Sequence, residues 1–105
     1  MYKQVHPTPF ADVNQDLNYF LDHTQSVLQH HFLGMYVVGS LALGDFHPST
    51  SDIDFVVVTD TSLENRLIRA LQEIHEQFAA SHSPWATRIE AVYAPKTVLN
   101  SHPPN

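Results

Sequence analysis

Residues 36–58 read YVVGSLALGDFHPSTSDIDFVVV, and this stretch decides the fold. Strand-forming residues precede its Gly-Ser pair, so we expect a buried strand at residues 35–38. Residues 53–59 give the strongest strand prediction in the chain. Their Phe-Val-Val-Val run is apolar on both faces, which is typical of a central strand covered on both sides. Between the two strands we predict a short helical turn over residues 40–44, with Ser40 as its cap, and then a loop.

Helical patterns lie on both sides of this stretch. Apolar residues spaced three and four apart predict a helix from about residue 9 to residue 31, which Gly34 can end in the left-handed conformation. Residues 61–64, Thr-Ser-Leu-Glu, match a capping box and predict a second helix that runs to about residue 80. A third strand is expected over residues 87–93. This order of elements indicates an α/β or α+β domain with a small mixed β-sheet flanked by helices.

Length and composition bound the domain organisation. The chain has 105 residues, of which 43% are hydrophobic and 15% are charged, as in a globular protein. We expect one domain over residues 1–105, with its core at about residues 10–98 and Pro-rich ends that are extended or frayed. The longest apolar runs are far too short to span a membrane and the N-terminus has no apolar signal, so we expect a cytoplasmic protein without a membrane partner.

The charged residues and the lack of cysteine exclude several classes of function. Acidic residues number 11 and basic residues 5, which gives a formal net charge of −6. Five basic side chains are too few to neutralise many phosphates, and we therefore expect no nucleic-acid partner. The chain has no cysteine, which excludes disulfides, thiolate nucleophiles and thiolate zinc sites.

A Gly-Ser pair ends the first predicted strand. Gly39 lets the backbone approach a ligand closely, and the following N–H groups and the Ser40 hydroxyl lie at a helix entrance, where anions are favoured. Taken alone, the pair is more simply a structural turn. It gains weight only from the acidic residues that follow it.

Two aspartates begin the central strand. Residues two apart in a strand share a face, so Asp52 and Asp54 are expected to project side by side. Two carboxylates at the start of a buried strand repel each other, and divalent cations such as Mg²⁺ offset that repulsion well. The alternative is that the aspartates are solvated or cap nearby backbone, as most charged residues do.

A third carboxylate lies in the last predicted strand. If that strand is adjacent to the central one, Glu90 completes a trio with the two aspartates. A carboxylate beside a metal-bound phosphate can take the proton of an attacking hydroxyl. The alternative is a surface ion pair between Glu90 and a neighbour such as Arg88.

Together these features resemble a known layout, the nucleotidyltransferase fold of the DNA polymerase β type. Residues 36–48 followed by residues 51–58 are similar to the aminoglycoside nucleotidyltransferases, which include the streptomycin/spectinomycin adenylyltransferases. Residues 85–93, WATRIEAVY, resemble the strand that carries the third carboxylate in that family. The resemblance covers about residues 10–100, and its most specific part is residues 39–54.

The resemblance implies a role for each matching residue. Gly39 and Ser40 would hold the β- and γ-phosphates of ATP. Asp52 and Asp54 would ligate two magnesium ions, and Glu90 would be the general base. The implied reaction is in-line attack of a hydroxyl of a small molecule, such as an aminoglycoside antibiotic, on the α-phosphate of ATP with release of pyrophosphate.

The sequence departs from this family in length. The related enzymes are more than twice as long and carry a C-terminal helical domain, so we expect low activity from these 105 residues alone. Two alternatives stay open. One is a minimal nucleotidyltransferase of a toxin–antitoxin pair that acts on or binds a helical partner protein, and the other is an inactive truncated fragment.

Other polar residues are assigned no role. Eight histidines are many for this length, but none are paired at a spacing of four on one helix face, so we do not expect a histidine metal site. Arg88 and Lys96 are the nearest basic residues in sequence, and neither is predicted to bind the phosphates.

Overall fold

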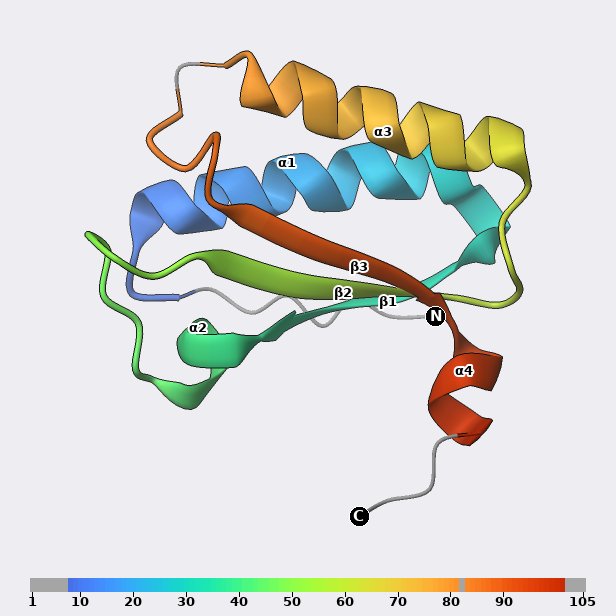
Figure 1. The fold of residues 1–105 in the computed structure, drawn as a ribbon, viewed down its shortest axis with the longest axis horizontal. Helices are drawn as coiled ribbons and strands as arrows, with labels where there is room; N and C mark the ends of the chain where they lie inside the picture. The colour runs from blue at the N-terminus through green and yellow to red at the C-terminus, as the bar shows by residue number, and fades with distance from the viewer. Residues whose placement is uncertain (1–7, 82, 102–105) are drawn as a thin grey trace.

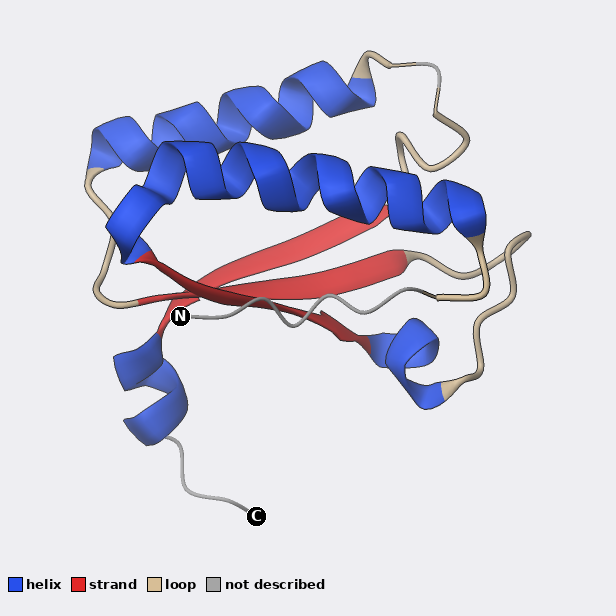
Figure 2. Ribbon diagram, turned by 180° about the vertical axis from the view of Figure 1, so that it is seen from behind, coloured by secondary structure: helices blue, strands red, loops and turns tan. Residues whose placement is uncertain are grey.

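The computed structural model describes residues 8–81 and 83–101 of the chain. Its elements, in chain order, are α1 (Ala11–Leu28), the 3-10 helix η1 (Gln29–His31), β1 (Phe32–Val38), α2 (Gly39–Leu43), β2 (Ile53–Thr59), α3 (Asn65–Ala79), β3 (Ile89–Pro95) and α4 (Lys96–Ser101). The two long helices lie side by side on one face of the sheet, and α2 and α4 project on its other side (Figure 1, and Figure 2 from behind). The predicted small mixed sheet flanked by helices is confirmed. Most of the two Pro-rich ends, whose extension was predicted, lies outside the described residues.

β2 is the central strand of a three-stranded sheet with the order β1-β2-β3. It pairs antiparallel with β1 and parallel with β3. The antiparallel pair needs only a reversal of the chain, which α2 and the following loop provide. The parallel pair needs a crossover, which α3 provides. This topology brings the beginnings of β2 and β3 to the same end of the sheet.

The core lies between the sheet and the two long helices. Ile53, Phe55 and Val57 of β2 are at most 1% exposed and face the helices. Phe20 of α1 packs against Phe55, with 5.2 Å between ring centroids, and against Phe78 of α3, with 4.7 Å. Strand alternation therefore turns Asp54 to the opposite face of the sheet, where it is half-buried.

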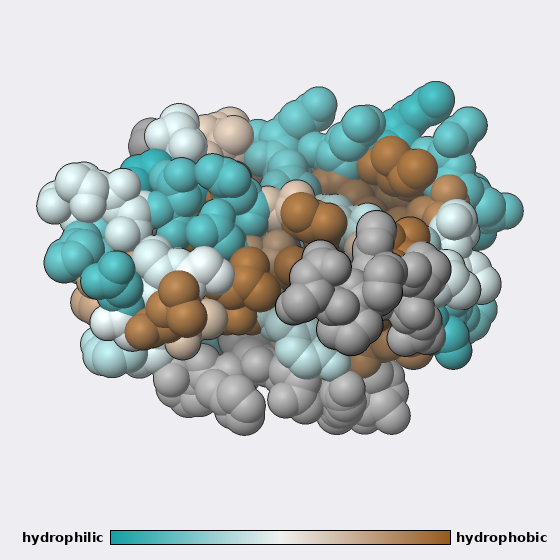
Figure 3. All heavy atoms as spheres, turned by 60° about the horizontal axis from the view of Figure 1, so that its bottom comes forward, coloured by the Kyte–Doolittle hydropathy of each residue, from teal (hydrophilic) through white to brown (hydrophobic). Residues whose placement is uncertain are grey.

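The face of the sheet opposite the long helices carries exposed side chains of both kinds. Figure 3 shows brown apolar groups among teal and white ones on this side of the molecule. Val38 of β1 and Val92 of β3 are exposed apolar residues of this face, because the strand register sets them opposite Asp54 and Val56 of β2. We refer to these two residues as the open-face valines. Among the described helices, none combines the length and the apolar character needed to cross a bilayer.

The end of the first helix differs from its prediction. α1 ends at Leu28, because Gln29 takes a φ of +51° and redirects the chain into η1. Gly34 does not end the helix but lies inside β1. A side chain there would press on the ring of Tyr36, since a Cβ would meet that ring at 3.0 Å. The glycine thus serves close packing within the strand and not helix termination.

The predicted caps of the other two helices are also wrong. α2 has Val38 as its N-cap and begins at Gly39, so Ser40 lies inside its first turn. α3 begins at Asn65 without a side-chain cap, and the capping box does not form. The hydroxyl of Thr61 instead donates to Oδ1 of Asp60 at 3.3 Å. β3 runs to Pro95, two residues beyond the predicted end of the third strand, and a further short helix, α4, which was not predicted, follows it directly.

We expect the stability of the fold to fall in mild acid because of His75. Its ring packs 4.8 Å from that of Phe20, its Nε2 lies 2.7 Å from the hydroxyl of Tyr93, and burial lowers its pKa. The folded state therefore disfavours protonation of His75. The contribution of neutral His75 to the free energy of unfolding is complete above the unfolded-state pKa of about 6.5. It is lost as the pH falls below that value, by at most about 1.4 kcal/mol per pH unit.

Urea unfolding of the wild type, His75→Gln and His23→Gln at several pH values between about 7.5 and about 5.5 tests this. The free energy of unfolding should fall less steeply with acid in His75→Gln than in the wild type. His23 lies exposed on α1, so His23→Gln should keep the wild-type slope. The same slope in the wild type and in His75→Gln would contradict the assignment.

Candidate active site

The pairing of the strands brings the predicted acidic residues together. Asp54 lies opposite Glu90 in the parallel pair of β2 with β3, and opposite Val38 in the antiparallel pair with β1. Asp52 precedes β2 by one residue. All three carboxyl groups therefore lie at one end of the sheet, and Asp54 and Glu90 share the face turned away from the long helices.

The electrostatics of the three groups show how closely they crowd. A side-chain hydrogen bond with Asp52, followed by the charges of Asp54 and Asp52, raises the pKa of Glu90. Loss of hydration, followed by the charge of Asp52, raises the pKa of Asp54. Both shifts mean that the trio, as a fully ionised cluster, opposes folding. A bound proton or a cation relieves that cost.

Gly39 lies directly against the trio. Its φ is +71°, in the left-handed region that favours glycine, and a Cβ on it would collide with Oδ2 of Asp54. The backbone directly after β1 therefore leaves no room for a side chain beside Asp54. Ser40 follows in the first turn of α2, where its carbonyl accepts a hydrogen bond of 2.9 Å from the N–H of Asp45. The structure therefore places Gly39 beside the acidic trio and Ser40 next to Gly39.

Arg88 is a residue of this region whose contacts the sequence analysis missed. Its guanidinium donates to the carbonyl of Ser51, lies 3.9 Å from Oδ1 of Asp52, and is 4.3 Å from the ring centroid of Trp85. It thus contacts Asp52 and not Glu90, unlike the ion pair considered above. The sequence indicated that Arg88 lies near the site, because Arg88 and Glu90 share a strand face. That Arg88 contacts Asp52 could not be predicted without the register of the strands. Lys96 follows the far end of β3.

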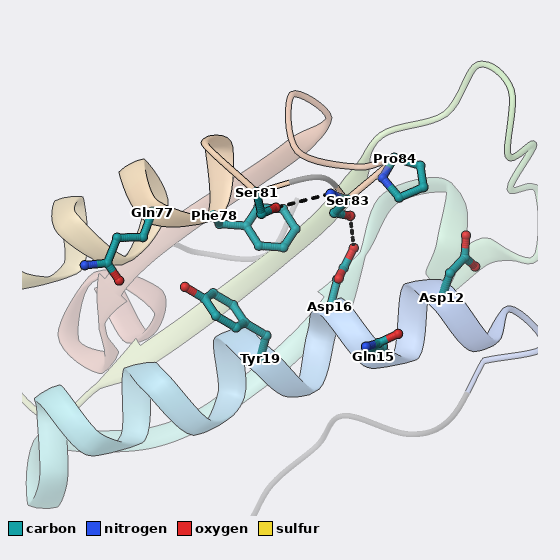
Figure 4. A pocket seen from close by; sticks show the side chains of 9 residues that line it. All are labelled: Asp12, Gln15, Asp16, Tyr19, Gln77, Phe78, Ser81, Ser83 and Pro84. Atoms are coloured by element: carbon teal, nitrogen blue, oxygen red, sulfur yellow. Dashed lines mark hydrogen bonds between the residues drawn. The ribbon is translucent and has the colours of Figure 1, made fainter.

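A hollow of about 520 Å³ lies away from the trio, between the first half of α1 and the end of α3 (Figure 4). The two carboxylates that line it, those of Asp12 and Asp16, accept hydrogen bonds from the segment that leads into β3. Asp16 accepts a hydrogen bond of 2.6 Å from the hydroxyl of Ser83, and Asp12 accepts one of 3.1 Å from the indole N–H of Trp85. These acidic groups are therefore occupied in positioning the chain just before Arg88 and Glu90.

The acidic trio offers the oxygen ligands that a divalent cation such as Mg²⁺ prefers, although its three carboxyl groups do not all lie within 4.8 Å of one another. Its donors are all carboxylates, and the raised pKa values of Asp54 and Glu90 show an excess of negative charge at this end of the sheet. Arg88 is the one described cationic side chain that an ion pair joins to the trio, at 3.9 Å. Mg²⁺ takes oxygen ligands of this kind and keeps positions open for phosphate oxygens.

We expect Gly39→Ala to destabilise the protein far more than Gly44→Ala. Both glycines have a φ near +70°, at +71° and +75°, so both substitutions carry the left-handed backbone cost of about 1–2 kcal/mol. A Cβ at Gly44 would have nothing within 4 Å, whereas one at Gly39 would collide with Asp54. Urea unfolding measures both losses, and equal losses would refute the close contact of Gly39 with Asp54.

Comparison with known proteins agrees with this geometry. Neither the curated proteins nor the solved structures include a significant match to the chain. The family model of the nucleotidyltransferase domain matches residues 23–102, well over half of the chain. This range contains α2, the whole sheet and the acidic trio. The chain therefore belongs to the nucleotidyltransferase domain family.

Proposed function

We propose that this domain transfers AMP from ATP to a hydroxyl group of a small molecule, with magnesium bound at the acidic trio. The observation that carries the proposal is the register of β2 with β3, which sets Glu90 opposite Asp54. Gly39 lies against Asp54, and Asp52 is a neighbour of Glu90. Membership of the family supports nucleotidyl transfer in general. The adenylyl group, the metal and the acceptor are the proposed refinements.

Each residue of the site receives a role that its surroundings allow. Asp52 and Asp54 would hold two magnesium ions, whose charge would offset that of the transferring phosphoryl group and help to orient the nucleotide. Gly39 and Ser40 take the β- and γ-phosphates, because a strand end without a side chain lets phosphate oxygens approach the backbone. Arg88 positions Asp52 and the carbonyl of Ser51, so it acts through the metal-binding residues.

Glu90 serves as the general base. Glu90 lies opposite Asp54 in the register of β2 with β3, and a carboxylate beside a metal-bound phosphate can take the proton of an attacking hydroxyl. It accepts the proton of the acceptor hydroxyl while the oxygen forms a bond to the α-phosphorus. The bond from the α-phosphorus to the bridging oxygen breaks, and pyrophosphate leaves with that oxygen. Atoms and charge balance without any further reactant.

An aminoglycoside antibiotic is the proposed acceptor. Such a molecule carries several amines, and the formal net charge of −6 favours a cationic ligand. A nucleic acid would be repelled by this charge balance.

We expect Asp54→Asn to stabilise the metal-free protein and to abolish its stabilisation by magnesium. Without divalent metal the variant should be more stable than the wild type, because one of three mutually repelling charges is gone. Added Mg²⁺ should raise the melting temperature of the wild type and leave that of Asp54→Asn nearly unchanged. Asp45→Asn is the matched control, since this nearby carboxylate is 81% exposed outside the trio and should respond like the wild type.

Titration calorimetry with Mg·ATP and a pyrophosphate-release assay complete the test. We expect ATP to bind the wild type and Glu90→Gln alike and to bind Asp54→Asn at least tenfold more weakly. Pyrophosphate release that depends on an aminoglycoside should be slow in the wild type and absent in Glu90→Gln. Heats that are indistinguishable between the wild type and Asp54→Asn would refute nucleotide binding at the trio.

A helical partner protein, as in a toxin–antitoxin pair, is the second candidate. The open-face valines favour it, because Val92 is 56% exposed and Val38 is 36% exposed on the side of the sheet that carries Asp54 and Glu90. A stable complex with a small helical protein on co-purification would support this function. A clean single species that adenylylates an aminoglycoside would decide against it.

A further inference from the structure

A second cluster of metal-binding side chains lies at the end of the sheet opposite the acidic trio. His30 and His31 belong to η1, just before β1, and Asp60 directly follows β2. The N–H of Asp60 donates to the carbonyl of His31 at 3.0 Å and so extends the β1–β2 ladder by one step. The backbone therefore holds these two connections side by side, independently of any side-chain contact.

The side chains converge at this point. Nδ1 of His31 lies 2.8 Å from Oδ1 of Asp60, and the rings of His30 and His31 are 4.1 Å apart between centroids. One ligand atom from each of the three residues lies within 4.8 Å of the other two. In a tetrahedral zinc site with bonds of about 2.1 Å, ligand atoms are about 3.4 Å apart. Small rotations of the side chains would reach that spacing.

The local backbone explains why neighbouring histidines can act together. Consecutive residues of a regular α-helix point about 100° apart and do not share a face. Here Gln29, with its φ of +51°, ends α1, and the tighter η1 follows. The two rings then lie against each other. The sequence analysis expected no histidine site because it looked for a spacing of four on a regular helix.

The donor set selects the class of metal. Two imidazoles and one carboxylate suit Zn²⁺ and similar transition-metal ions, whereas Mg²⁺ prefers oxygen ligands alone. Solvent can reach the cluster, since His30 is exposed and the side chains of His31 and Asp60 are 29% and 30% exposed. Ligands on two connections of the same sheet would link chain segments that are 29 residues apart.

We propose that His30, His31 and Asp60 form a binding site for a zinc-class ion that fastens the α1–β1 connection to the β2–α3 connection. Water completes the coordination. The role of the site is structural, because the sheet separates it from the acidic trio at the other end of β2. It stands independently of the proposed nucleotidyl transfer.

Zinc titration of the full chain, first stripped of metal by a chelator, tests the proposal. Excess Mg²⁺ is kept in the buffer to occupy the acidic trio. Calorimetry should give one Zn²⁺ per wild-type chain, with affinity at least tenfold lower in His30→Ala and in Asp60→Asn. Zn²⁺ should raise the melting temperature of the wild type and not that of His30→Ala. Cobalt in place of zinc should give the intense visible absorption of a tetrahedral ion.

Two controls separate this site from the others. His23→Ala removes an exposed histidine of α1 and should bind Zn²⁺ like the wild type, whereas an equal loss would mean scattered surface binding. Asp54→Asn should also keep wild-type zinc binding, even if nucleotide binding fails. Equal zinc affinity in the wild type, His30→Ala and Asp60→Asn would overturn the proposal and leave the contact of His31 with Asp60 as a hydrogen bond only.

Discussion

The pairing of β2 with strands on both sides is the constraint on which the rest of the molecule depends. It forces three carboxyl groups to one end of the sheet, although their mutual repulsion opposes that arrangement. The free energy that holds them together comes from elsewhere, chiefly from the apolar side of the same strand. Ile53, Phe55 and Val57 are buried against the long helices, so β2 cannot slip by one residue without exposing them. The packing of β2 in the core therefore also fixes the position of Asp54 relative to Glu90 in the candidate active site.

The beginning of β3 is held by contacts that reach back to the first helix. Asp12 and Asp16 of α1 accept hydrogen bonds from Trp85 and Ser83, and Arg88 lies over the indole ring of Trp85. The guanidinium of Arg88 then donates to the carbonyl of Ser51, immediately before Asp52. A continuous set of contacts thus joins α1 to the acidic trio. The hollow lined by these aspartates is better understood as support for the trio than as a second substrate site.

The class of fold and the central strand could be predicted from the sequence, because they depend on local patterns, whereas the residues of the candidate site stay a prediction. The alternation of Asp52, Ile53 and Asp54 before an apolar run predicts both carboxylates on one face, and the structure places Asp54 on the open face and Asp52 one residue before β2. Helix ends were predicted less well, since Gln29 and Glu64 have no strong capping signal and the competing signals at Gly34 and Thr61 serve other contacts. What local patterns could not supply was proximity across the sheet. The partner of Arg88 and the meeting of His31 with Asp60 both depend on the register of strands.

Trp85 is the only tryptophan of the chain, and its surroundings make it an optical reporter for the site. Its indole is 3% exposed, donates to Asp12, and lies 5.4 Å from the ring of Phe46 in the loop that leads to Asp52. Both segments that flank the carboxylates therefore touch a single fluorophore. Emission from that fluorophore follows the seating of these segments directly, without any attached dye, whenever ligand or denaturant changes their packing.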